Sequence, residues 1–163
     1  MGLDFEVYKL RKGETINDLW DMSYEDREER SLAYARKGWE LVYALNCATS
    51  GDCTSKLKLE DWVDLMDKMA PIGDYFKDIW DAYHTIDAIE DDYDTLAELR
   101  AAYPREMKLI EIYHIWYDKT FDTPPTLGYQ FSVGYMLNFW EAADKVLGYL
   151  EDPDWEVWMV ASY

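Results

Sequence analysis

Residues 73–99 read GDYFKDIWDAYHTIDAIEDDYDTLAEL, and the rest of the chain is best interpreted outward from this stretch. Its apolar residues recur every three or four positions, which is the period of a helix with a wide apolar face. They are Phe76, Ile79, Trp80, Tyr83, Ile86, Ile89, Tyr93, Leu96 and Leu99. The spacing predicts a long amphipathic helix that anchors the core. Crowding of carboxylates within one turn at residues 91–94 favours a break there.

The other face of the same stretch is acidic, and Lys77 is its only basic residue. The carboxylates are Asp74, Asp78, Asp81, Asp87, Glu90, Asp91, Asp92, Asp94 and Glu98. On a helix, side chains three or four positions apart have Cβ atoms about 5–6 Å apart. Duplex DNA carries roughly one charge per 1.7 Å of its axis. The row therefore indicates a surface that competes for a basic, nucleic-acid-binding groove, and the alternative is an ordinary solvated face.

Composition limits the classes of function. The 163 residues include 34 acidic and 16 basic ones, for a net charge of −18, with 49% hydrophobic and 17% aromatic residues. We expect one acidic globular domain over residues 1–163, because this length and apolar content can bury a sizeable core. The charge argues against direct binding to nucleic acid or to an anionic membrane. We also expect no signal peptide and no membrane span.

The remaining segments predict a mostly helical α+β fold with about five helices. Residues 4–11 and 155–163 alternate in polarity, and we expect these terminal strands to pair in a small antiparallel sheet. Helical spacing covers residues 24–46, 59–69, 73–99, 104–121 and 135–150. Strand remains an alternative within 109–116, which is rich in β-formers. Residues 14–22 and 49–55 are expected to be loops, and residues 128–134 a short strand or loop.

Two histidine motifs suggest a metal-dependent alternative. Asp81 and His84 form D-x-x-H, and Glu111 and His114 form E-x-x-H. On facing helices, with one further carboxylate from each of two other helices, such motifs build di-iron or di-manganese sites. The available carboxylates are Glu28, Glu29, Glu40 and Glu141. The competing interpretation is two ordinary histidines, so the leading hypothesis includes no metal, no cofactor and no catalysis.

The two cysteines, Cys47 and Cys53, lie in CATSGDC. A reducing cytoplasm favours free thiols, with a small loop disulfide as the alternative. Residues 90–94 carry four carboxylates that suit a hard cation, but the EF-hand pattern and its turn glycine are absent.

Short motifs along the chain resemble a broad family of uncharacterised phage and bacterial proteins that open with MGLDMYL. Here the opening is MGLDFEVYKL. Further similar positions are Tyr34, Arg36, Lys37, Asp52, Cys53, Pro125, Thr126, Gly128, Phe131, Gly134, Tyr135, Ala161, Ser162 and Tyr163. The chain departs from the family's helix motif at Ala35, Trp39 and Val42, so a family site built on those positions is not intact. The resemblance implies a phage or prophage origin and the cytoplasm of an infected bacterium.

These observations lead to one hypothesis and two alternatives. The hypothesis is a non-enzymatic inhibitor of the anti-CRISPR or anti-restriction type, which mimics nucleic acid to bind a basic host defence protein. The first alternative is the di-iron or di-manganese enzyme. The second is an oligomeric structural protein, including a homodimer, because eight Trp and fourteen Tyr exceed the needs of one small core.

Overall fold

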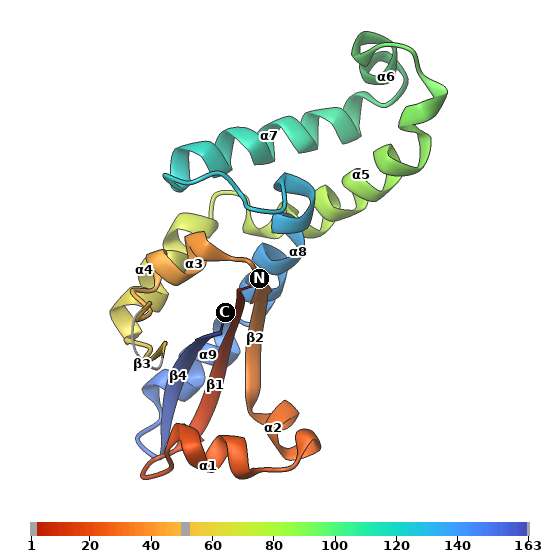
Figure 1. Ribbon diagram of the computed structural model, residues 1–163. Helices are drawn as coiled ribbons and strands as arrows, with labels where there is room; N and C mark the ends of the chain where they lie inside the picture. Colours follow the sequence, from red (N-terminus) through yellow and green to blue (C-terminus); the bar gives the residue numbers. More distant parts are fainter. Residues whose placement is uncertain (1–2, 50–52, 163) are drawn as a thin grey trace.

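The two terminal strands form the centre of the sheet. The structure is a computed structural model that describes residues 3–49 and 53–162. Strand β1 (Asp4–Arg11) pairs antiparallel with β4 (Trp155–Ser162) over its whole length, from Asp4 opposite Ser162 to Arg11 opposite Trp155. Strands β2 (Ser31–Arg36) and β3 (Thr54–Lys56) add to the outside, giving the order β2-β1-β4-β3 (Figure 1). The predicted pairing of the terminal strands is confirmed.

Alternation along these strands produces two buried faces. One face presents Phe5 and Val7 to the main core, together with Val157, Met159 and Ala161 from β4. The opposite face carries Tyr8, Leu10 and Val160, which pack with Leu19 in a second, smaller core. Strand β4 is thus covered on both sides, which explains why residues 155–160 (WEVWMV) carry apolar side chains on both faces of the strand.

The described part of the chain contains nine α-helices rather than about five. They are α1 (Ile16–Asp21), α2 (Tyr24–Arg30), α3 (Trp39–Ala44), α4 (Leu59–Met69), α5 (Phe76–Ile89), α6 (Leu96–Ala102), α7 (Pro104–Thr120), α8 (Tyr129–Glu141) and α9 (Ala143–Glu151). The 3-10 turns η1 (Gly73–Tyr75) and η2 (Glu90–Asp92) flank α5. None of the helices in residues 3–49 and 53–162 is long and apolar enough to span a membrane.

Helix α8 connects the sheet to the rest of the helical layer. Its Phe139 stacks on Phe5 of β1, with ring centroids 5.9 Å apart. On its other side α8 packs against α5, and α7 returns alongside α5. Helices α5 and α7 therefore form a hairpin that projects away from the sheet, with η2 and α6 at its far end (Figure 1). We call the segment from α5 to α7 the hairpin.

The single helix expected over residues 24–46 is wrong. Ser23 caps α2, because its hydroxyl accepts a hydrogen bond from the Asp26 amide at 3.1 Å. The chain then becomes strand β2, with Ala33 and Ala35 buried and Tyr34 and Arg36 exposed. Ala, Leu and Arg favour helices, but pairing with β1 overrides that weak preference.

Four further expectations fail. The expected loop at 14–22 contains α1, where Thr15 and Asp18 form a complete capping box. The strand or loop expected at 128–134 is the first part of α8, and the helix expected over 135–150 divides into α8 and α9. The expected loop at 49–55 ends in the short strand β3. By contrast, α4 has its predicted bounds, and residues 104–120 are helical rather than extended.

A substitution at Gly73 tests the packing at the base of the hairpin. A Cβ added there would lie 2.3 Å from the Trp140 indole, whereas a Cβ at Gly148 in α9 meets no atom within 4 Å. We expect Gly73→Ala to destabilise the protein by about 1–3 kcal/mol through overpacking. Gly148→Ala should stabilise it by roughly 0.5–1 kcal/mol, because alanine favours the helix interior. Urea denaturation of both variants checks this, and equal midpoints would show that Trp140 moves aside at no cost.

Candidate functional site

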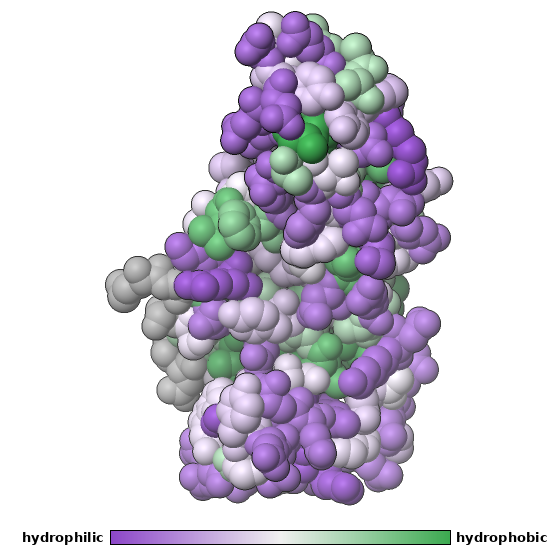
Figure 2. All heavy atoms as spheres, turned by 90° about the vertical axis from the view of Figure 1, so that its right-hand side faces the viewer, coloured by the Kyte–Doolittle hydropathy of each residue, from purple (hydrophilic) through white to green (hydrophobic). Residues whose placement is uncertain are grey.

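The far end of the hairpin carries a cluster of exposed carboxylates. We call it the acidic tip, and it consists of Glu90, Asp91, Asp92, Asp94 and Glu98. From residue 78 to residue 99 the sequence has eight carboxylates and no Lys or Arg. Figure 2 shows hydrophilic residues over most of the projecting part, with small hydrophobic patches between them. The tip therefore presents concentrated negative charge at the point of the molecule farthest from the sheet.

The remaining predicted carboxylates lie along α5 and at its start. Asp74, Asp81 and Asp87 are exposed, and Asp78 is half-buried. Lys77 approaches Asp81 at 3.8 Å, and Arg105 approaches Asp78 at 3.7 Å. Exposed pairs of this kind contribute little to stability. The structure thus separates this partly neutralised group on α5 from the acidic tip.

A straight row of carboxylates does not form, because the expected break occurs. Helix α5 ends at Ile89, where its carbonyl end disfavours the negative charges of Glu90, Asp91 and Asp92. Helix α6 is a separate helix capped by Thr95, whose hydroxyl accepts a hydrogen bond from the Glu98 amide at 3.2 Å. The Glu98 carboxylate in turn accepts from the Asp94 amide at 3.2 Å. The result is a compact cluster in place of a regular helical array.

A hollow of about 260 Å³ opens within the acidic tip. Its walls include Glu90, Asp91 and Asp94 together with the apolar parts of Tyr93 and Leu96. Leu96 is 56% exposed, although the helical spacing predicted it on the apolar face. An exposed apolar side chain beside carboxylates suits a partner with aliphatic and cationic groups side by side, such as lysine and arginine side chains.

The two histidine motifs do not form a metal site. The His84 Nδ1–H donates to the Trp80 carbonyl oxygen at 2.8 Å, within its own helix. His114 instead forms a hydrogen bond with the Tyr83 hydroxyl and stacks on Tyr129, with ring centroids 3.9 Å apart. Within residues 3–49 and 53–162, no three His, Cys, Asp or Glu side chains gather in a way that could hold a metal ion. The set Asp81, His84, Glu111 and His114 is therefore not assembled, and the carboxylates at 90–94 form no preformed cation cage.

The cysteines show no sign of a reactive site. Cys47 is buried and Cys53 is partly buried. Burial is the main cause that raises the pKa of the Cys47 thiol, so the reactive thiolate is disfavoured at neutral pH.

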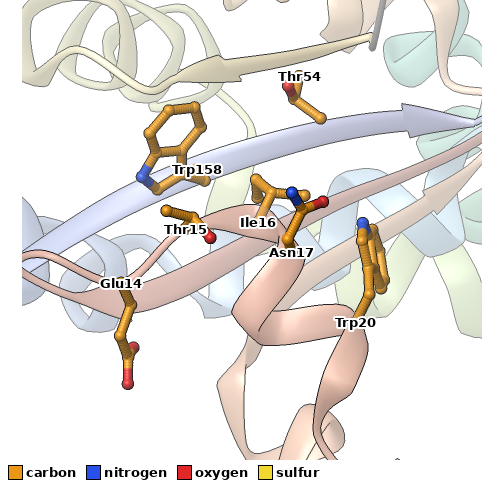
Figure 3. Close-up of a pocket in the computed structure, with 7 residues that line it drawn as sticks. All are labelled: Glu14, Thr15, Ile16, Asn17, Trp20, Thr54 and Trp158. Atoms are coloured by element: carbon orange, nitrogen blue, oxygen red, sulfur yellow. The ribbon is translucent and has the colours of Figure 1, made fainter.

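A second hollow lies at the opposite end of the molecule. It measures about 630 Å³ and is bounded by α1, by Thr54 of β3 and by Trp158 of β4 (Figure 3). Trp20 and Trp158 stand on different sides of it, while Glu14 points away and pairs with Arg30 at 2.7 Å (Figure 3). Its walls combine Ile16 and the two tryptophans with the polar residues Glu14, Thr15, Asn17 and Thr54. The sequence did not predict this hollow.

Buried Glu40 is another residue that the sequence identified only as one of several available carboxylates. It is 3% exposed, on α3, and it accepts a hydrogen bond from the Tyr135 hydroxyl. Its signal in the sequence is a lone acid within the apolar run WELVYAL. Because charged side chains are rarely fully buried, such a position is a candidate functional residue.

Comparisons with protein-family models, curated proteins and solved structures gave no match to this chain. The functional argument therefore depends on the acidic tip, the hollows and the buried charge described above.

His114 makes the attachment of α7 to α5 dependent on pH. Burial lowers its pKa, against the opposing effect of Asp118, so the folded state favours the neutral ring. The unfolded state binds a proton near pH 6.5, so the stabilising contribution is present above that pH and is lost as the pH falls below it. We expect the stability advantage of the wild type over His114→Phe to shrink between pH 7.5 and pH 5, measured by urea denaturation. A constant difference would show that His114 titrates alike in both states.

Proposed function

We propose that this protein is a non-enzymatic inhibitor whose acidic tip binds a basic, nucleic-acid-binding protein. The observation that carries this proposal is the location of the carboxylates: they are exposed, they have no intervening Lys or Arg from residue 78 to residue 99, and they lie at the end of a projecting hairpin. In that position they can enter a groove that a flat acidic surface could not.

The net charge supports a basic partner and disfavours nucleic acid itself. A charge of −18 repels phosphates and attracts a positively charged groove over a long range. A partner that normally neutralises phosphates with Lys and Arg would meet carboxylates in their place. Because the tip is a compact cluster, we infer that it occupies one phosphate-binding region rather than imitating a full turn of a duplex.

The resemblance to phage and bacterial proteins supports a proposal for the origin of the chain, and its charge supports one for the class of partner. We infer a phage or prophage protein that acts in the cytoplasm of an infected bacterium, and a partner that belongs to host defence, of the CRISPR or restriction type. The exposed Leu96 would supply an apolar contact at the centre of the charged interface.

The proposal is tested by capture from a bacterial lysate with two matched variants. The tip variant combines Asp91→Asn, Asp92→Asn, Asp94→Asn and Glu98→Gln. The control variant removes the same number of charges from exposed positions elsewhere, through Glu60→Gln, Asp67→Asn, Glu141→Gln and Asp144→Asn. We expect wild type and control to retain a nucleic-acid-binding protein that added duplex DNA or high salt releases, and the tip variant to bind it about tenfold or more weakly.

Capture that is equal for all three proteins, or that DNA and salt leave unchanged, would contradict the proposal. The tip variant should fold at least as stably as wild type, because removing like charges at the end of α5 reduces repulsion and an unfavourable interaction with the helix dipole. Circular dichroism during urea denaturation checks this. Loss of binding with undiminished stability would then be due to the carboxylates themselves.

A further inference from the structure

A cavity of about 290 Å³ lies at the other end of α7 from the acidic tip. It is lined by Glu40, Tyr43 and Ala44 of α3, by Lys68 of α4, and by the segment from Thr120 to Thr123. Helix α7 has 17 residues, so its rise of 1.5 Å per residue separates this cavity from the tip by roughly 25 Å. The cavity is thus a separate site, and what it binds does not depend on the proposed function of the tip.

Glu40 is the unusual feature of this cavity, because it combines a carboxyl group with 3% exposure. Tyr135 donates its hydroxyl to Oε1. The Glu40 backbone and the Tyr117 hydroxyl also stabilise the carboxylate, and its roughly four lone-pair positions leave room for a further donor. Burial is the main cause that raises the Glu40 pKa. A positive group in the cavity would reverse that effect.

A second buried hydroxyl lies beside Glu40. Tyr117 is 0% exposed, and its hydroxyl interacts with the Glu40 carboxylate as a side-chain donor, although the contact does not have the geometry of a regular hydrogen bond. In the proposed complex, an incoming N–H shares the Glu40 carboxylate with the Tyr135 and Tyr117 hydroxyls.

The other walls suit a cation with an aliphatic or planar body. Tyr43 is 56% exposed and stacks on Trp39, with ring centroids 5.9 Å apart, and Phe121 is a second aromatic residue of the lining. Aromatic faces attract ammonium and guanidinium groups. The one cationic wall residue, Lys68, is paired with Asp64 at 3.3 Å, and Asp122 adds a second carboxylate.

We propose that this cavity binds an organic cation, a primary ammonium or a guanidinium group, with Glu40 as its counter-ion and Tyr43 and Phe121 as its aromatic walls. The cation comes either from a free small amine or from a lysine or arginine side chain of a protein. In both cases the same N–H groups bind the Glu40 carboxylate. A bound cation favours the ionised form of Glu40, which opposes the effect of burial on its pKa.

The test is a calorimetric titration of the full-length protein with n-butylammonium chloride, with methylguanidinium chloride and with the peptide acetyl-Gly-Lys-Gly-amide. We expect millimolar binding of at least one probe, and at least tenfold weaker binding to Glu40→Gln, which keeps an oxygen for Tyr135 and loses the charge. The control Asp144→Asn removes an exposed carboxylate that does not line the cavity and should change affinity less than threefold.

The probes also distinguish the source of the cation. Tighter binding of the peptide than of the free amine supports the site and indicates a protein side chain, and the reverse order supports it and indicates a small ligand. Absence of binding by all three probes at 50 mM, or equal binding to wild type and Glu40→Gln, overturns the proposal. If Glu40→Gln fails to fold by circular dichroism, Tyr43→Ala decides: a severalfold loss of affinity supports the site, and unchanged affinity overturns it.

Discussion

Aromatic packing holds α5 and α7 of the hairpin together, hydrogen bonds from α7 join them to the body, and the exposure of the hairpin's carboxylates depends on these contacts. Phe76 of α5 contacts Tyr113 and Trp116 of α7, with ring centroids 6.2 and 5.5 Å away. The Tyr113 hydroxyl lies 2.5 Å from Ser132 of α8, and the Trp116 indole donates to the Lys68 carbonyl at 2.9 Å. Because apolar burial and satisfied polar atoms stabilise this seam, the acidic residues are not needed as ion-pair partners and can remain exposed.

Sequence periodicity predicted those parts of the fold whose local preference agrees with their tertiary environment. The terminal strands, α4, α7 and the break after α5 are of this kind. Strand β2 is the opposite case, since Ala33 and Ala35 favour a helix and only pairing with β1 makes them extended. The start of α8 was missed because Gly134 resembles a loop residue, whereas a Cβ there would lie 2.8 Å from Trp80. Close helix packing, which a single sequence does not reveal, requires that glycine.

The candidate sites were predictable to different degrees. Charged side chains stay at the surface when a chain folds, so the sequence indicated that most carboxylates of residues 74–98 would be exposed. It could not determine how the break at η2 would arrange them. The capping residue Thr95, three positions before Glu98, was a readable signal for the start of α6. The cavity beside Glu40 was not predictable, because its walls come from α3, α4 and the segment after α7, which only the folded chain brings together.

Positions where local preferences are violated are the best evidence of function in this molecule. Burial raises the pKa of Glu6 to about 7, with added repulsion from Glu28 and Asp4, so a charge there destabilises the fold at neutral pH. Glu40 is buried deeper still, and the acidic tip accumulates like charges where a helix end disfavours them. If only the stability of the fold mattered, a neutral residue would be preferred at each of these positions. The tip and the Glu40 cavity also provide room for a cation, which is the one group that would make their carboxylates favourable. Both proposals therefore assign a positively charged group to carboxylates that the 16 basic residues of this chain, against 34 acidic ones, leave without a counter-charge.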